Sequence, residues 1–180
     1  MFTRMIMAAT LLAGSTQLIY AGPQYVDETG FAVGGYDVVA YHDLEQAPVG
    51  EPQPEAVPGK SSITAEYNGA RWAFSSPENR DRFLADPEKY APRFDGHCAY
   101  GVAKGGKVPG NPNLWRIVGN ELYLNITPNA ATFFEQDISG NISRASRSWN
   151  TMESAEASSG SWKSISENDG TYSTKAPLND

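Results

Sequence analysis

Apolar and polar residues alternate in two stretches of the chain, and a polar pair of residues interrupts each stretch. The first stretch comprises residues 63–67 and 70–74, which Asn68-Gly69 separates. Such a pair supplies the positive φ angles of a type I′ turn, which is typical of a β-hairpin. Because a two-residue loop fixes the register, we expect three pairs on one face: Tyr67 with Ala70, Ala65 with Trp72, and Ile63 with Phe74.

The second hairpin is predicted over residues 114–118 and 121–125, with Gly119-Asn120 at the turn. Its alternation gives two facing apolar pairs, Ile117 with Leu122 and Trp115 with Leu124. Two hairpins with apolar inner faces predict a small antiparallel sheet.

Proline in the first turn marks three helix starts. Each proline follows a residue whose side chain caps helix N-termini, in the pairs Ser76-Pro77, Asp86-Pro87 and Thr127-Pro128. Helical spacing predicts two further apolar stripes: Ala130, Phe134 and Ile138, then Ile142, Ala145 and Trp149. Because the strands and helices show no βαβ order, the sequence predicts an α+β fold with several short helices packed on the sheet. The proline-rich residues 46–60 are expected to form an exposed loop.

Both ends of the chain differ in composition from the middle. Residues 1–21 combine an early positive charge with an apolar stretch that ends at Ala21. This pattern predicts a secretory signal peptide cleaved after Ala21, and a buried N-terminal helix is the alternative. Residues 153–180 are rich in serine, which predicts a disordered tail, with a short docked segment at residues 162–165 as the alternative. The predicted folded domain is residues 22–152, located in the periplasm or outside the cell.

Charge and composition narrow the classes of function. The chain has 180 residues, with 14 Lys and Arg against 21 Asp and Glu, and a formal net charge of −7. An acidic chain gains little from a phosphate backbone, so nucleic acid is not an expected partner. No apolar run long enough to span a membrane follows the N-terminal stretch. The single cysteine excludes an internal disulfide and a four-cysteine zinc site.

Three side chains are candidates for chemistry: His42, His97 and Cys98. Imidazole and thiolate ligands suit copper or zinc, and a helix that begins near Cys98 would lower the pKa of its thiol. His97 and Cys98 are adjacent, so both reach one ion only in an irregular turn. The alternatives are that Cys98 is a small buried apolar residue and that His42 forms a surface ion pair with Asp37 or Asp43.

Several short segments spread over residues 36–149 carry a family resemblance. They include GYDVVAY at residues 35–41, EYNG at 66–69, DPEKYAP at 86–92 and GHCAYGVA at 96–103. Together with the predicted 114–125 hairpin, these segments resemble the YHS-domain family in its longer, secreted bacterial form. The resemblance implies a small α+β domain that is associated with copper and other heavy metals.

The chain departs from this family at the residues that matter for metal. The resemblance implies that shorter, metal-handling relatives carry cysteine at three positions, which are Ala40, Ser75 and Asn79 here. A methionine of those relatives is replaced by His42. The thiolate site of the relatives is therefore not expected to operate, and any metal would need the three candidate ligands instead.

The sequence leaves three functions open. The first is an exported binding module that takes copper or zinc through His42, His97 and Cys98. The second is a module that binds a small molecule or a protein partner without metal, with Cys98 as a structural residue. The third is an enzyme with Cys98 as nucleophile, for which the sequence offers no recognisable orienting group. A binding role is therefore favoured over catalysis.

Overall fold

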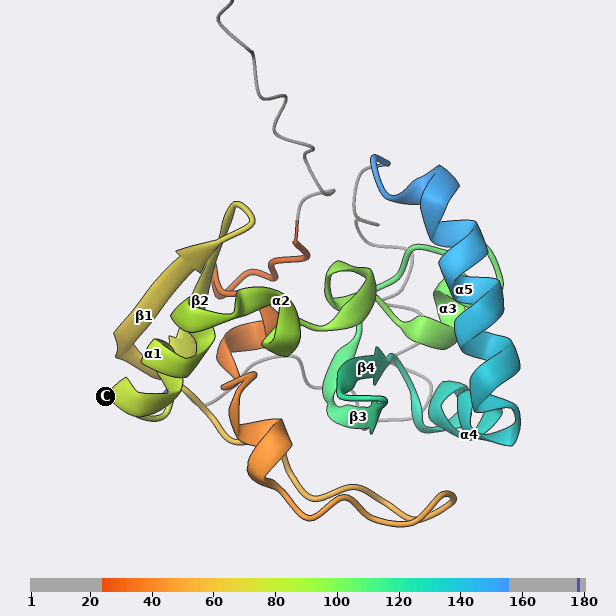
Figure 1. Ribbon diagram of the computed structural model, residues 1–180. Helices are drawn as coiled ribbons and strands as arrows, with labels where there is room; N and C mark the ends of the chain where they lie inside the picture. Colours follow the sequence, from red (N-terminus) through yellow and green to blue (C-terminus); the bar gives the residue numbers. More distant parts are fainter. Residues whose placement is uncertain (1–23, 156–177, 179–180) are drawn as a thin grey trace, which may run out of the picture.

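The chain forms two lobes, which lie side by side in Figure 1. The structure, a computed structural model, describes residues 24–155 and residue 178. The first lobe contains two 3₁₀ turns, Val33–Gly35 and Ala40–Asp43, followed by β1 (Lys60–Tyr67), β2 (Ala70–Phe74), α1 (Pro77–Ala85) and α2 (Pro87–Tyr90). After a third 3₁₀ turn, Arg93–Gly96, the second lobe contains α3 (Ala99–Ala103), β3 (Asn111–Val118), β4 (Glu121–Asn125), α4 (Pro128–Gln136) and α5 (Ile138–Met152).

This arrangement confirms the predicted α+β fold. The single sheet expected from the two hairpins is not formed, because among the described residues each hairpin forms its own two-stranded antiparallel sheet, β1–β2 and β3–β4. The turns have the predicted geometry, since Asn68 and Gly69 have φ angles of 48° and 69°, and Gly119 and Asn120 have φ angles of 60° and 68°. Positive φ at both turn residues is the mark of the type I′ turn.

The register of the β3–β4 hairpin is the predicted one, with Ile117 opposite Leu122 and Trp115 opposite Leu124. The β1–β2 hairpin follows the prediction only near its turn, where Tyr67 faces Ala70 and Ala65 faces Trp72. The expected pair of Ile63 and Phe74 is wrong. A register shift between Lys60 and Thr64 brings Lys60 opposite Phe74, and such a bulge leaves no signal in the alternation of side chains.

All three predicted helix caps are present. The side chains of Ser76, Asp86 and Thr127 accept hydrogen bonds from backbone N–H groups in the first turns of α1, α2 and α4. The third helix is shorter than its apolar stripe predicts, because Asp137 follows the end of α4 and caps α5. Ile138 therefore begins α5 instead of ending α4.

The β3–β4 hairpin lies between the cores of the two lobes. Leu122 and Leu124 pack into the core of the first lobe, whereas Tyr123 packs into the core of the second lobe. Successive strand residues point to opposite faces, so this strand is buried on both sides. Its residues thereby fix the second lobe against the first. The first core is built mainly on aromatic rings, including Trp72, Phe74, Phe83 and Trp115.

The predicted signal peptide, residues 1–21, lies outside the described residues, as does nearly all of the predicted tail. Two ends of that tail are described. Residues 153–155 continue from α5, and the side chain of Leu178 lies so close to Gly35 that a Cβ added there would be 2.7 Å from Leu178 Cδ2. The helices of residues 24–155 are all too short or too polar to cross a membrane.

Candidate functional site

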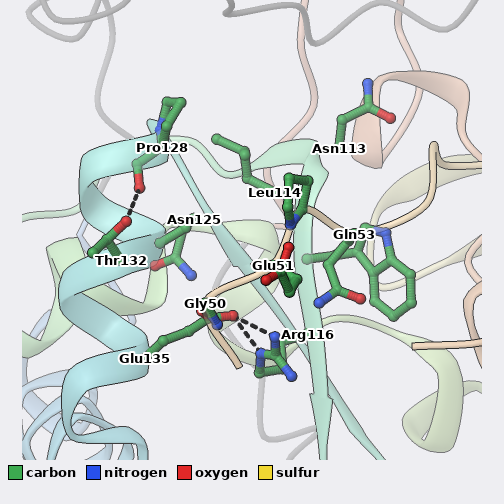
Figure 2. A pocket seen from close by; sticks show the side chains of 13 residues that line it. Gly50, Glu51, Gln53, Asn113, Leu114, Arg116, Asn125, Pro128, Thr132 and Glu135 are labelled. Atoms are coloured by element: carbon green, nitrogen blue, oxygen red, sulfur yellow. Dashed lines mark hydrogen bonds and ion pairs between the residues drawn. The ribbon is translucent and has the colours of Figure 1, made fainter. Parts of the chain in front are cut away.

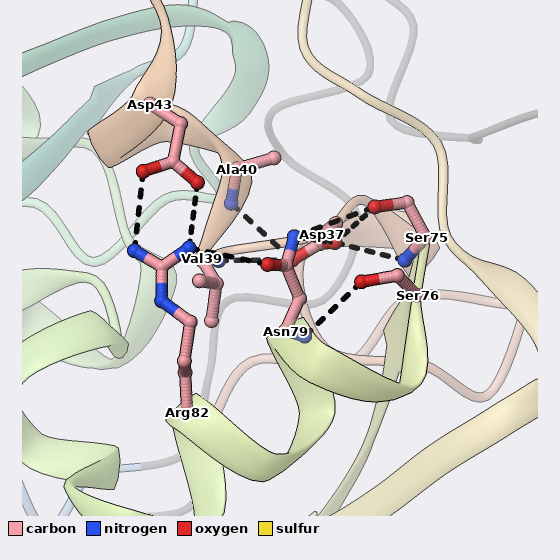
Figure 3. A network of polar contacts seen from close by, with 8 residues as sticks. All are labelled: Asp37, Val39, Ala40, Asp43, Ser75, Ser76, Asn79 and Arg82. Carbon is pink, nitrogen blue, oxygen red and sulfur yellow. Dashed lines mark hydrogen bonds and ion pairs between the residues drawn. The ribbon is translucent and has the colours of Figure 1, made fainter.

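A buried carboxylate, Asp37, lies at the centre of a polar network that includes Ser75 and Asn79. Its side chain is fully buried and accepts five hydrogen bonds (Figure 3). Oδ1 accepts from the backbone N–H groups of Val39 and Ala40, at 3.0 and 3.3 Å. Oδ2 accepts from the backbone N–H and hydroxyl of Ser75, at 2.8 and 2.6 Å, and from Asn79 Nδ2 at 2.7 Å. A carboxylate with this many donors is satisfied without a metal ion.

The network extends from Asp37 toward the surface through α1. The Asn79 side chain accepts a hydrogen bond from Arg82 through its oxygen at 3.2 Å. Arg82 in turn donates two hydrogen bonds to the carboxylate of Asp43, at 2.6 and 3.1 Å. The hydrogen bonds from Arg82 are the main reason why the pKa of Asp43 is lowered. Figure 3 shows that Asn79 and Arg82 project from the same side of α1, where they bind Asp37 and Asp43.

His42 is not held by either neighbouring acid. Its expected partners are engaged elsewhere, because Asp37 is bound to Ser75 and Asn79, and Asp43 is bound to Arg82. The His42 ring instead lies edge-on against Tyr90, with ring centroids 5.1 Å apart. Its Nε2 is buried and has no hydrogen-bond partner. Burial, followed by the charge of Lys89, lowers the pKa of His42, so the ring is neutral at neutral pH.

His97 is fully buried in the second lobe. Its Nδ1 lies 2.8 Å from the carbonyl oxygen of Phe94, and a carbonyl can only accept, so this nitrogen carries the proton. The ring packs against Tyr25 and Trp149, at 5.7 Å between centroids in both cases. Nε2 is buried without a partner, and burial lowers the pKa of His97 to about 4.

Cys98 is the N-cap residue of α3, which confirms the prediction that a helix begins near this residue. Its sulfur accepts a hydrogen bond from the backbone N–H of Gly101 at 3.2 Å. The expected lowering of its pKa is nevertheless wrong, because complete burial raises the pKa of the thiol to about 11. At neutral pH Cys98 is therefore a protonated thiol packed against Ile126 and Ala130. This environment matches the alternative interpretation of a small buried residue.

The three candidate metal ligands belong to different environments. His42 contacts Tyr90 in the first lobe, His97 contacts Trp149 on α5, and Cys98 contacts Ile126 beyond β4. Over residues 24–155, no three His, Cys, Asp or Glu side chains are grouped closely enough to hold a metal ion. The predicted copper or zinc site at His42, His97 and Cys98 therefore gains no support from the geometry.

A pocket of about 290 Å³ lies between residues 50–53, β3 and α4 (Figure 2). Its apolar lining comes from Leu114, Trp115, Pro128 and Ala131. Pockets of this kind, mostly apolar with a few placed polar groups, are the usual sites for small ligands. At about 30 Å³ per water molecule of liquid volume, this space accommodates roughly ten non-hydrogen atoms.

A buried ion pair shapes one wall of the pocket. Arg116 on β3 donates to Glu135 on α4 through Nε at 2.6 Å and lies 2.5 Å from it through a terminal nitrogen. The guanidinium also donates to the carbonyls of Ala47 and Pro48, and the second oxygen of Glu135 accepts from the N–H of Gly50. The predicted loop thus has a defined place, because this pair fastens it to both β3 and α4.

Two polar groups in the pocket have no partner in the described part of the chain. Asn125, at the end of β4, is only 2 % exposed, and its Oδ1 accepts from the N–H of Tyr100 at 3.2 Å. That bond fixes the orientation of the amide, so Nδ2 faces the pocket (Figure 2) and makes no hydrogen bond with residues 24–155. The carboxylate of Glu51 likewise lines the pocket and has no ion pair or hydrogen bond among the described residues.

No pattern in the amino-acid sequence predicts this pocket. Asn125 stands at the end of a predicted strand, Arg116 within one, and Glu51 in a predicted loop, and none of the three belongs to a recognisable motif. A charged residue within a predicted strand, such as Arg116, indicates a buried ion pair only when its partner is known. The partner, Glu135, lies 19 residues further along the chain, so no local pattern reveals the pair.

Comparison with known families covers part of the first lobe. Residues 53–94 match the YHS domain. The match includes both strands of the first hairpin, α1 and α2, and it confirms the family resemblance over this segment. The YHS domain is a domain associated with metal binding. The resemblance implies cysteine in metal-handling relatives at Ser75 and Asn79, which lie inside the matched residues, and both side chains are bound to Asp37. Neither the curated proteins nor the solved structures gave a match to the chain.

Proposed function

We propose that the chain is an exported binding module that takes a small organic cation bearing a carbonyl group, without a metal ion. The ligand occupies the pocket between residues 50–53, β3 and α4. The observation that carries this proposal is the pair of unpartnered groups there, the Asn125 amide nitrogen and the Glu51 carboxylate. Export rests on the signal-peptide pattern of residues 1–21.

The chemistry of the two groups determines the class of ligand. Asn125 Nδ2 is a donor that faces the pocket and has no acceptor among the described residues. A carbonyl oxygen of the ligand supplies its acceptor. Glu51 is an exposed carboxylate at the pocket, and it attracts an ammonium group. Arg116 does not attract an anion, because Glu135 already neutralises it at 2.5 Å.

The network around Asp37 supports a function without metal at the family position. Ser75 and Asn79 offer a hydroxyl and an amide where the metal-handling relatives offer thiolates, and both donate to Asp37. Soft metals such as Cu(I) select thiolate ligands. An enzyme built on Cys98 is not proposed, since burial keeps its thiol protonated at neutral pH.

Leucinamide is a suitable probe, because it combines an ammonium group, an amide carbonyl and a short apolar side chain. We expect it to bind the full chain more tightly than N-acetylleucinamide, which lacks the cation, or 4-methylpentanoate, which is an anion. Chemical shift changes of residues 50–53, 113–116 and 125–135 in ¹H–¹⁵N NMR spectra report the site.

Glu51→Gln is the decisive variant, since Glu51 is exposed and the change preserves its shape. We expect it to weaken leucinamide binding by about threefold to tenfold. Glu55→Gln, an exposed residue of the same loop outside the pocket, is the matched control and should have no effect. Equal binding of all three probes, or equal effects of Glu51→Gln and Glu55→Gln, would overturn the proposal.

A further inference from the structure

A second cavity lies on the other side of Asn125 from the pocket of the proposed function. It has a volume of about 360 Å³ and shares no lining residue with that pocket. Its walls are apolar and include Val108, Ile126 and Ala130, with the buried Cys98 at its floor. By the measure used above, it accommodates roughly a dozen non-hydrogen atoms.

One large aromatic side chain is exposed at the rim of this cavity. Phe133, on the outward side of α4, is 48 % exposed, and its ring stacks on Tyr100 with centroids 5.5 Å apart. A large apolar side chain beside a hollow with apolar walls is a feature of ligand grooves. The cavity and its rim therefore form one continuous apolar surface from Cys98 outward to Phe133.

One positive charge stands at this rim. Lys104 lines the cavity, and its Nζ lies 5.3 Å from the centroid of the Tyr100 ring. Among residues 24–155, no carboxylate forms an ion pair with Lys104, although the protein as a whole carries a net charge of −7. The charge at the rim is thus available to an anion whose remaining part is apolar.

We infer that this cavity binds a small amphipathic carboxylate, with its hydrocarbon part against Ile126, Ala130 and Phe133 and its carboxylate beside Lys104. Burial of the hydrocarbon supplies most of the affinity, and Lys104 selects the sign of the charge. The inference is independent of the proposed function, whose pocket selects a cation through Glu51.

Decanoate below its micellar concentration is the probe, and decyltrimethylammonium, with the same hydrocarbon chain and the opposite charge, is its counterpart. We expect saturable binding of decanoate by the full chain, with NMR shift changes confined to residues 98–108 and 126–133. Decyltrimethylammonium should bind at least fivefold more weakly. Leucinamide should not compete with decanoate, so the two proposed sites can be tested separately.

Two pairs of exposed residues give matched variants. Lys104→Glu should weaken decanoate binding about five- to tenfold, whereas Lys89→Glu should leave it unchanged, since Lys89 lies 4.9 Å above the ring of Tyr90 in the other lobe. Phe133→Ser should weaken it similarly, and Leu84→Ser should not, because Leu84 is equally exposed at 53 % but lies on α1.

Several results would overturn the inference. These are an absence of saturable decanoate binding, equal binding of both amphiphiles, or equal effects of Lys104→Glu and Lys89→Glu. Association with phosphatidylglycerol vesicles without binding of free decanoate would also contradict it and would identify a membrane contact instead. All four variants are at exposed positions, so a melting temperature close to that of the parent chain will show that they are folded.

Discussion

The side chain of Asp37 is the centre of a polar network beside residues 53–94, which match the YHS domain. Its two oxygens accept five hydrogen bonds from two stretches of chain, residues 39–40 and residues 75–79. All of these donors point at a carboxylate, and an amide in its place would turn an N–H₂ group toward other donors.

We therefore predict that Asp37→Asn lowers the free energy of unfolding by about 2–4 kcal/mol, the range for disrupting a buried charged hydrogen-bond network. Urea unfolding measures the loss. Asp81→Asn is the matched control, because the Asp81 side chain is 66 % exposed and its ion pair with Arg80 lies at the surface, where such pairs contribute little. A loss of less than 0.5 kcal/mol for Asp37→Asn would refute the importance of the network.

His97 predicts a pH dependence of stability. Its pKa is lowered from 6.5 to about 4 in the folded chain, so between these values the unfolded chain binds a proton that the folded chain does not. The contribution of His97 to the free energy of unfolding is therefore complete above pH 6.5 and is lost as the pH falls toward 4. Asp95, whose pKa burial raises to about 6, acts in the opposite direction, since its contribution is lost as the pH rises through the window from about 4 to 6.

Because the two effects overlap, the imidazole must be observed directly. The chain has two histidines, so their NMR signals are readily assigned with a His42→Ala variant. We expect His97 to remain neutral at pH 5, with the proton on Nδ1, while His42 becomes protonated at higher pH than His97. Protonation of His97 near pH 6.5 would show that the ring is not buried as described.

The sequence could place these residues in local structure but not in the network. Ser75 and Asn79 lie beside the helix start that Ser76-Pro77 predicts. In the structure they are also the donors to Asp37, which lies 38 and 42 residues earlier in the chain. Local patterns carry no information about a contact of that separation.

At the scale of the elements, prediction from sequence succeeded where the signal is local. Caps, first-turn prolines and type I′ turns involve residues within four positions of one another, so the pattern alone determines them. The errors in the length of α4 and in the register of β1–β2 have physical reasons of the same kind. Asp137 can cap a new helix as readily as continue an old one, and the bulge near Ile63 depends on what the strand packs against.

The turn at Asn68-Gly69 gives a prediction at this scale. Gly69 has φ of 69°, and a Cβ added there meets nothing within 4 Å, so a substitution costs only backbone strain. Gly69→Val should lower the free energy of unfolding by about 1–3 kcal/mol, because β-branched residues avoid positive φ. Gly69→Asn should cost less, since asparagine tolerates this region. Equal stability of the valine variant and the parent chain in thermal unfolding would contradict the turn assignment.

At the scale of the whole molecule, the first pocket lies where the two lobes meet, and the second cavity lies within the second lobe. The first pocket joins residues 50–53 to β3 and α4, and the second joins α3 to α4. Residues 50–53 meet β3 and α4 because the β3–β4 hairpin packs into the cores of both lobes. The α+β class could be predicted from the order of elements, whereas the pockets could not, since they depend on how the hairpins pack and not on any one segment.

The central claim is that this chain binds its ligand without metal, although residues 53–94 match a domain associated with metal binding. Native mass spectrometry, after incubation with one equivalent of Cu(I) or Zn(II) at pH 7, tests it most directly. We predict that the full chain retains no more metal than the variants Cys98→Ser and His42→Ala, since the three candidate ligands lie in separate environments. Retention of one metal ion per chain, lost in both variants, would contradict the account and establish the metal site.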